Sequence, residues 1–257
     1  MSRIRARKVV ARPGVSNRIK PFMRQLGYDV KVVDKKWGWA TAWLPDNLRK
    51  QGLDPATIVD VGVARGTPQL YKAFPNAYLV LIEPVKEFEP ALERIVAERP
   101  GEYVLAAAGA EDGTAKMFMH PRSITGSSIA PQIGPDGRER KPDPEHEREV
   151  PVRTLDSLLA EHDWKPPFGL KIDSEGFEYQ VIQGASKFLE QTQFVIAEVV
   201  VSRRFIDGYD VASFMSLIYS HGFELCDILD APRPRRDREI VFFDGLFWKR
   251  PDGLRRI

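Results

Sequence analysis

Short apolar runs alternate along this chain with segments of helical period, starting at Thr57. Apolar runs predict strands buried inside a sheet, whereas apolar residues at spacings of three and four, such as Phe88, Leu92, Ile95 and Val96, predict amphipathic helices. The strands that the pattern predicts are 57–61, 78–82, 103–108, 115–119, 169–173, 194–197, 223–229 and 241–248. Alternating strands and helices are typical of an α/β fold with a mostly parallel sheet. The last two strands have no helix between them, so we expect them to pair antiparallel.

Two segments lie outside this alternation. Residues 1–52 are basic, and a short helix is predicted over 21–27; we expect an N-terminal extension here and one domain over 53–257. Residues 120–149 contain a stretch rich in glycine, proline and charge with no period. Long irregular loops in compact domains are often functional, so we expect 120–149 to lie beside a substrate.

Composition indicates in which cellular compartment the protein is expected. Of 257 residues one is cysteine, which excludes an intrachain disulfide and suits the reducing cytoplasm. No apolar run approaches the ~20 residues of a membrane-spanning helix, and the basic N-terminus lacks the apolar stretch of a signal peptide. We therefore expect a cytoplasmic protein.

Positive charge gathers at the N-terminus, where residues 1–36 hold eleven Lys or Arg against two Asp. Trp37, Trp39 and Trp43 follow directly, and tryptophan favours half-wet positions. A peripheral contact with an anionic membrane surface is one interpretation; a solvated tail beside an aromatic cover of the core is the other. The basic residues form no stripe beside a pocket, so we expect no nucleic-acid partner.

A glycine turn follows the first predicted strand. It reads D-x-G-x-x-x-G from Asp60 through Gly62 to Gly66, with a helix predicted from Pro68. Glycine lets backbone pass close to a ligand, and the turn therefore indicates a nucleotide-like cofactor. A dinucleotide fingerprint would have glycine at Ala64, so the spacing favours S-adenosylmethionine over a nicotinamide cofactor.

Acidic residues stand at four predicted strand ends, namely Asp60, Glu83, Asp173 and Glu198. Ligands of parallel α/β sheets bind at the carboxyl ends of the strands, and buried carboxylates are costly without partners. Glu83 can accept hydrogen bonds from both ribose hydroxyls of an adenosine. These acids therefore mark the predicted site.

Three motifs are informative together: Asp60-Val61-Gly62 with Gly66, Ile82-Glu83-Pro84, and the string from Leu170 to Glu178. They give the chain a resemblance to the FkbM-type S-adenosylmethionine-dependent methyltransferases. Ser127-Ser128, residues 152–156 and residues 244–247 support it, and it covers roughly 57–249. The family commonly has D-V-G-A-N-x-G where this chain has Val63-Ala64-Arg65, so Arg65 is an extra cation here.

The resemblance implies a class I methyltransferase, Rossmann-like fold: a seven-stranded, mostly parallel sheet with an antiparallel C-terminal hairpin. It also implies methyl transfer from S-adenosylmethionine to a hydroxyl of a saccharide, glycolipid or polyketide-like acceptor. The residues predicted to bind the cofactor are Asp60, Gly62, Val63, Gly66, Glu83, Pro84, Ala108 and Asp173.

A hydroxyl nucleophile needs a base or a metal to remove its proton. The main catalytic candidates are Asp173, Glu175, Glu198 and His146, with Glu178 and His120 behind them. Asp173 with Glu198 could instead bind Mg²⁺ through oxygen ligands. Two alternatives stay open, a nicotinamide-dependent oxidoreductase and a non-catalytic cofactor-binding module, as does the oligomeric state.

Overall fold

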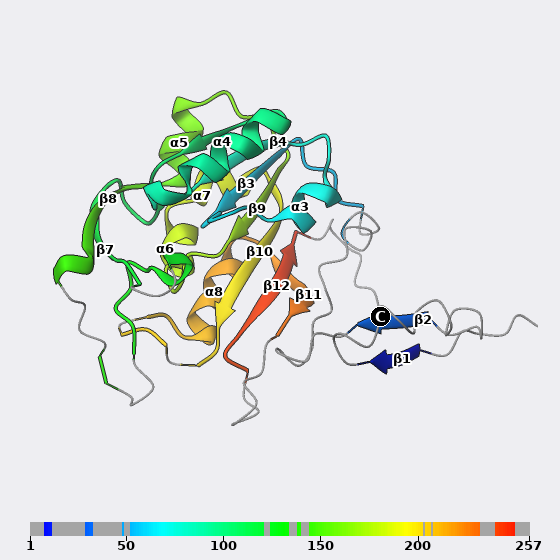
Figure 1. The fold of residues 1–257 in the computed structure, drawn as a ribbon. Helices are drawn as coiled ribbons and strands as arrows, with labels where there is room; N and C mark the ends of the chain where they lie inside the picture. The colour runs from blue at the N-terminus through cyan, green and yellow to red at the C-terminus, as the bar shows by residue number, and fades with distance from the viewer. Residues whose placement is uncertain are drawn as a thin grey trace, which may run out of the picture.

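The computed structural model describes residues 8–11, 29–32, 48, 52–120, 124–133, 138–139, 144–202, 204–206, 208–231 and 240–249. A seven-stranded sheet in the order β11-β12-β10-β9-β3-β4-β5 runs through its centre (Figure 1). Its strands are β3 (Thr57–Val61), β4 (Tyr78–Ile82), β5 (Gly101–Val104), β9 (Phe168–Ile172), β10 (Thr192–Val200), β11 (Glu224–Asp230) and β12 (Phe242–Trp248). All neighbours pair parallel except β12, which is antiparallel to both β10 and β11. This arrangement confirms the class I methyltransferase fold.

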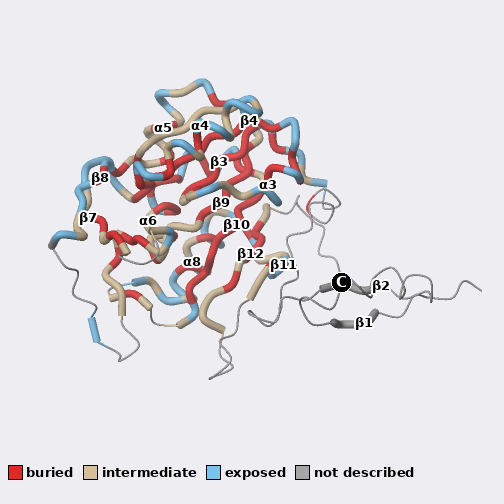
Figure 2. Tube along the Cα trace, in the orientation of Figure 1, coloured by how far each residue is buried: buried red, intermediate tan, exposed pale blue. Residues whose placement is uncertain are grey.

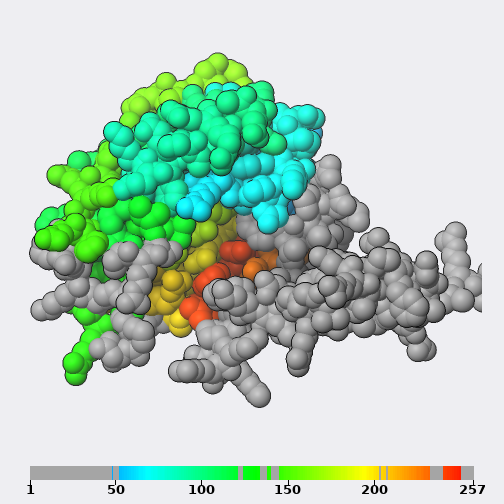
Figure 3. Space-filling model, viewed as in Figure 1, coloured from blue at the N-terminus to red at the C-terminus, as the bar shows by residue number. Residues whose placement is uncertain are grey.

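Helices cover both faces of the sheet. The helical elements described between the strands are α3 (Pro68–Ala73), η1 (Lys86–Phe88), α4 (Glu89–Glu98), η2 (Ile124–Gly126), η3 (Pro144–His146), α5 (Leu155–Glu161), α6 (Glu178–Gln183), α7 (Ser186–Glu190) and α8 (Val211–Ser220). One buried cluster joins α5, α6, α7 and α8 to the sheet, and a second cluster joins α3 and α4 to its other face. In Figure 3 the orange and red of β11 and β12 show below the cyan segment around α3.

Alternation within the strands explains why both faces are apolar. In β4, Val80 and Ile82 belong to the first cluster, whereas Leu79 and Leu81 belong to the second. All four side chains are fully buried, and Figure 2 shows buried residues concentrated along the central strands. Because both faces of β4 are buried, its sequence is an uninterrupted apolar run, as predicted.

A three-stranded sheet lies beside the main one in the order β6-β8-β7. Its strands are β6 (Ala107–Ala108), β7 (Gly113–Phe118) and β8 (Glu147–Arg153). The prediction of one strand over 103–108 was wrong, because the chain leaves the main sheet after Val104 and joins β8 at Ala107. The predicted irregular segment 120–149 is also too long, since its last three residues begin β8.

Glu198 lies inside β10 and not at the strand end where it was predicted, because β10 continues to Val200 beside β12. Between β9 and β10 the chain forms two helices, α6 and α7, and their apolar residues Val181, Ile182, Phe188 and Leu189 are all fully buried.

The N-terminal extension contains two described strands, β1 (Lys8–Ala11) and β2 (Asp29–Val32), which pair parallel. Neither strand was predicted. The predicted helix over 21–27 and the three tryptophans lie outside the described residues, and the division at residue 52 stays a prediction. Within the described part of the chain no helix is long and apolar enough to cross a membrane.

Candidate functional site

A cavity of about 220 Å³ opens at the carboxyl ends of β3, β4 and β9. It lies where the strand order reverses, since the chain passes from β3 to β4 on one side and β9 pairs with β3 on the other. Such a switch point is where open α/β sheets bind their ligands. One part of the wall is apolar and consists of Pro84, Val85, Phe88, Ala107, Ala108 and Met117. The acidic residues in the wall are Glu83, Asp173, Glu175 and Glu198.

The turn after β3 brings backbone to the cavity edge. Gly62 has φ +74°, and a Cβ there would collide with the carbonyl oxygen of Asp173. Ala64 also has positive φ, +47°, although a side chain disfavours that region. Its amide donates a 2.8 Å hydrogen bond to Oε2 of Glu83, which helps hold the strained turn in place. Alanine thus occupies a conformation that usually favours glycine.

Glu83 is buried at the end of β4 and is held from two sides. Oε2 accepts the Ala64 N–H at 2.8 Å and Oε1 accepts the Val85 N–H at 2.9 Å. Burial raises the pKa of Glu83, and these two amides together with Lys171 oppose the rise. Each carboxylate oxygen has a second lone pair, so Glu83 can still accept hydrogen bonds from two hydroxyl groups of a ligand in the cavity.

Asp60 was predicted to bind the cofactor, but it does not line the cavity. Its carboxylate is fully buried and accepts a 2.6 Å hydrogen bond from the Tyr71 hydroxyl, while Lys171 Nζ lies 3.5 Å from Oδ1. Lys171 also pairs with Asp173 at 3.2 Å. Burial opposes the charge of Lys171, yet Asp173 and Asp60 together raise its pKa. Asp60 therefore orients the lysine behind the cavity wall.

The turn from Ser174 to Phe177 is organised by Glu178, the first residue of α6. Its fully buried carboxylate accepts hydrogen bonds from the N–H groups of Ser174 and Gly176, at 2.9 and 3.1 Å, and from the Tyr209 hydroxyl at 2.9 Å. These hydrogen bonds occupy the Glu178 carboxylate and hold the backbone of the turn in place. The turn places Glu175 in the cavity wall with φ +50°.

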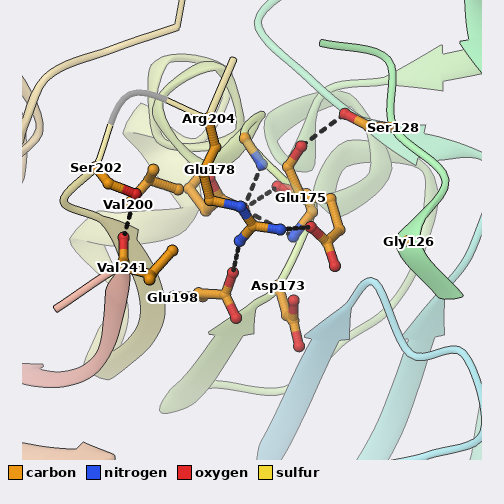
Figure 4. Close-up of polar contacts among 12 residues, drawn as sticks. Gly126, Ser128, Asp173, Glu175, Glu178, Glu198, Val200, Ser202, Arg204 and Val241 are labelled. Atoms are coloured by element: carbon orange, nitrogen blue, oxygen red, sulfur yellow. Dashed lines mark hydrogen bonds and ion pairs between the residues drawn. The ribbon is translucent and has the colours of Figure 1, made fainter. Parts of the chain in front are cut away.

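Glu175 and Glu198 form ion pairs with the same arginine (Figure 4). Arg204 Nη2 lies 3.2 Å from Glu175 Oε2, and Nη1 lies 3.6 Å from Glu198 Oε1. Burial raises the pKa of Glu175 to about 7; Arg204 lowers it, while Asp173 and Glu178 raise it. Burial and the neighbouring carboxylates, of which Asp173 contributes most, raise the pKa of Glu198 well above its usual range.

The described part of 120–149 supplies another side of the cavity. Ile124, Thr125, Ser127 and Ile129 line it, and the Ser128 hydroxyl donates a 2.6 Å hydrogen bond to the carbonyl oxygen of Glu175. This contact ties the segment to the acidic wall.

Of the predicted cofactor-binding residues, Gly62, Glu83, Pro84, Ala108 and Asp173 line the cavity. Asp60, Val63 and Gly66 do not, although all three lie in the strand and turn that form its edge. Val63 instead packs in the second core cluster.

Neither the two candidate histidines nor the extra cation Arg65 lines the cavity. Neither His146, in η3 (Pro144–His146), nor His120 is among the described residues that line it, and Arg65 is exposed outside it. Arg204 was missed by the sequence analysis. It stands in an irregular segment after β10, where no motif or period marks it.

The predicted magnesium site gains no support. Asp173 and Glu198 line the same cavity, but they are paired with Lys171 and Arg204. Across the residues that the structure describes, no cluster of three or more His, Cys, Asp or Glu could hold a metal ion. The donor set does not fit Mg²⁺, and we assign it no step.

Comparison with known proteins adds the following. Residues 60–225 match the methyltransferase FkbM domain. Among solved structures, a methyltransferase FkbM from Methylobacillus flagellatus is similar, with 14% identity, 93% of this chain and 73% of that chain covered, and a TM-score of 0.48.

Two further structures are magnesium protoporphyrin IX methyltransferase from Synechocystis with bound S-adenosylmethionine and 1,6-didemethyltoxoflavin-N1-methyltransferase from Burkholderia thailandensis with bound S-adenosylhomocysteine. Their identities are 10% and 14% and their TM-scores 0.44 and 0.39; each match covers 80% of this chain and 76% of that chain. No curated protein matches the chain.

Proposed function

This chain belongs to the methyltransferase FkbM domain family, and from that premise we propose that it methylates a hydroxyl oxygen of a small-molecule acceptor. S-adenosylmethionine is the methyl donor, and the acceptor is a saccharide, a glycolipid or a polyketide-like molecule. Placement of Glu175 carries the proposal: it is a largely buried carboxylate in the wall of the cavity that would hold the cofactor.

The cavity suits the adenosine part of the cofactor. Glu83 presents two acceptor oxygens for the ribose hydroxyls, and Val85, Phe88 and Ala108 form an apolar wall next to it that suits a flat base. Gly62 leaves room at the strand end where a Cβ would close the approach. The residues present therefore fit S-adenosylmethionine.

When bound, S-adenosylmethionine supplies an electrophilic methyl group on a sulfonium. The residues of the chain would position the acceptor oxygen and take up its proton. A pKa of about 7 lets Glu175 act as a base near neutral pH, because part of the population is ionised and the carboxylate still binds a proton well. Asp173 and Glu198 line the same cavity and are the secondary candidates, whereas His146 lies outside the wall.

Calorimetry with S-adenosylmethionine and with NAD tests the cofactor. Binding of NAD alone would favour an oxidoreductase and overturn the proposal. A labelled-methyl transfer screen over saccharides, glycolipids and polyketides then tests the reaction; cofactor binding without transfer would favour a non-catalytic binding module.

With an acceptor in hand, Glu175→Gln should lower kcat by about 10²–10⁴-fold, the usual contribution of a general base. Glu89→Gln is the matched control, because Glu89 accepts a hydrogen bond from the Tyr103 hydroxyl and does not line the cavity. Full activity in a folded Glu175→Gln protein would exclude Glu175 as the base.

A further inference from the structure

Arg204 does not line the cavity but pairs with two carboxylates of its wall, and several contacts determine its position. Its guanidinium lies 5.4 Å from the ring centroid of Phe205 and 5.7 Å from that of Phe242, both within cation–π range. Its backbone carbonyl accepts a 2.7 Å hydrogen bond from the Ile133 N–H. The arginine thus contacts two aromatic rings, and its backbone is tied to the segment 124–133, part of which lines the cavity.

From this position the guanidinium reaches two carboxylates that belong to different elements. Glu175 comes from the turn before α6 and Glu198 comes from β10, and both line the cavity. Glu198 Oε1 is buried without a hydrogen-bond partner among the described residues, so the arginine at 3.6 Å is its compensating charge. Without a cation here, two buried carboxylates would face each other and favour protonation.

We infer that Arg204 is a positioning residue of the methyl-transfer site: its charge favours the ionised forms of Glu175 and Glu198, so that the cavity, once these carboxyls are ionised, binds the cationic cofactor more tightly than its neutral product. The inference rests on the proposed function, because it takes S-adenosylmethionine as the ligand of the cavity.

The chemistry of the transfer explains why a preference for S-adenosylmethionine over S-adenosylhomocysteine would help the reaction. A C–O bond forms to the acceptor oxygen as the C–S bond breaks, the electron pair of that bond stays on sulfur, and the hydroxyl proton passes to a carboxylate. The sulfonium charge therefore disappears in the reaction. A wall that is anionic before transfer holds the cofactor, and it holds the uncharged thioether less tightly, which favours release of S-adenosylhomocysteine.

Other charged groups surround the two carboxylates and enter the balance. Lys171 approaches from β9, and Asp173 approaches from the turn after it. Glu178 approaches from α6 and Asp244 from β12, where Asp244 pairs in register with Glu198. Lys171 is already shared between Asp60 and Asp173. Among the described residues, Arg204 is the cation that forms ion pairs with both Glu175 and Glu198.

The experiment measures the dissociation constants of S-adenosylmethionine and S-adenosylhomocysteine separately by calorimetry between about pH 5.5 and 9, with the full chain. In the wild type the affinity ratio in favour of S-adenosylmethionine should rise at least about tenfold over this range, since an opposite charge within a few ångströms shifts a carboxyl pKa by about 1–3 and linkage is reciprocal. Its midpoint should lie near the Glu175 pKa of about 7.

Two variants assign the effect. In Glu175→Gln the ratio should vary only as far as the two ligands themselves titrate. In Arg204→Gln the midpoint should move at least about one pH unit higher, because loss of the cation raises the carboxyl pKa. Affinity for S-adenosylhomocysteine should stay the same, whereas a merely structural role of Arg204 would weaken both ligands at every pH.

Arg153 offers a matched control, because it also meets two carboxylates, Asp112 at 3.6 Å and Glu161 at 2.6 Å, away from the cavity wall. Arg153→Gln should keep the wild-type profile. If Arg204→Gln does not fold, Arg204→Lys is the second variant, because it retains the charge and should keep a midpoint near that of the wild type. Glu175→Gln then still tests whether the pH dependence of the affinity ratio comes from Glu175.

A ratio independent of pH in the wild type, or an unchanged midpoint in folded Arg204→Gln, overturns the inference while the proposed function stands. If neither ligand binds the wild-type protein, the proposed function is wrong and the inference falls with it.

Discussion

Replacement of Glu83 by glutamine tests the cofactor assignment most directly. The carboxylate performs two tasks in the structure: it accepts the N–H groups of Ala64 and Val85 and it faces the cavity. Glutamine has nearly the same shape, but one of its two terminal groups donates instead of accepting. The substitution therefore removes one acceptor position and the negative charge without creating a hole.

The expected magnitudes follow from these contacts. Loss of a hydrogen bond from a ribose hydroxyl to a charged acceptor should weaken binding by about 1.5–3 kcal/mol, or roughly 10- to 150-fold in Kd. One backbone N–H would face an amide NH₂ and lose its partner, which should cost about 1–3 kcal/mol of folding stability. Alanine would leave both N–H groups unpaired, so glutamine is the better probe of binding.

Calorimetry with S-adenosylhomocysteine measures the first effect, and urea unfolding followed by circular dichroism measures the second. Glu89→Gln serves as the control, because its carboxylate contacts Tyr103 outside the cavity, and it should bind the ligand as the wild type does. Unchanged affinity in folded Glu83→Gln protein would refute the placement of the ribose at Glu83.

Four further predictions follow from other parts of the molecule. Gly62→Ala should destabilise the fold by about 3 kcal/mol or more in urea unfolding, because a Cβ meets a backbone carbonyl at positive φ; Gly222→Ala, also at positive φ but with open space around it, should cost only about 1–2 kcal/mol. Burial raises the pKa of Glu175 from 4.5 to about 7, so the folded state binds its proton more tightly and the wild type loses stability as pH rises through this window; relative to wild type, Glu175→Gln should gain about 3 kcal/mol between pH 4.5 and 8, and an equal difference at both pH values would contradict the burial argument. Hydrogen exchange over 124–133 should slow when cofactor and acceptor are both bound, because this segment lines the cavity; equal exchange in both states would make it an ordinary surface loop. We also propose that the basic N-terminus contacts anionic membranes: sedimentation with anionic vesicles should weaken in a chain without residues 1–20 and as salt rises from 0.1 to 1 M, since the Debye length falls from ~10 to ~3 Å, and equal sedimentation of both chains would exclude this role.

Local patterns were sufficient to place the central strands. The strands 57–61 and 78–82 were predicted to the residue, because strands covered on both faces are mostly apolar and because a turn marked by Gly62 or Pro84 follows each of them. A hydroxyl residue just before an apolar helix is also a local signal, and Thr154 caps α5 with a side chain that accepts the Ser157 N–H. The antiparallel ending followed from the missing helix between the last two strands.

Pairing between distant segments decided what those patterns could not. The chain leaves the main sheet after Val104 because Ala107 pairs with Val152, which lies 45 positions later in the sequence. Local propensity carries no information about such a partner, and a strand over 103–108 was therefore the natural but wrong prediction.

The candidate site divides in the same way between sequence and structure. Glu83 and Gly62 could be identified from the sequence, because a carboxylate at a strand end and a glycine in a strand-to-helix turn have a local chemical signature. Asp60 shares that signature, yet its side chain turns to Tyr71 and Lys171, and only the packing shows it. Arg204 has no signature at all: its role arises because an irregular segment brings its guanidinium to Glu175 and Glu198, whose charges are costly to bury unless a cation lies beside them.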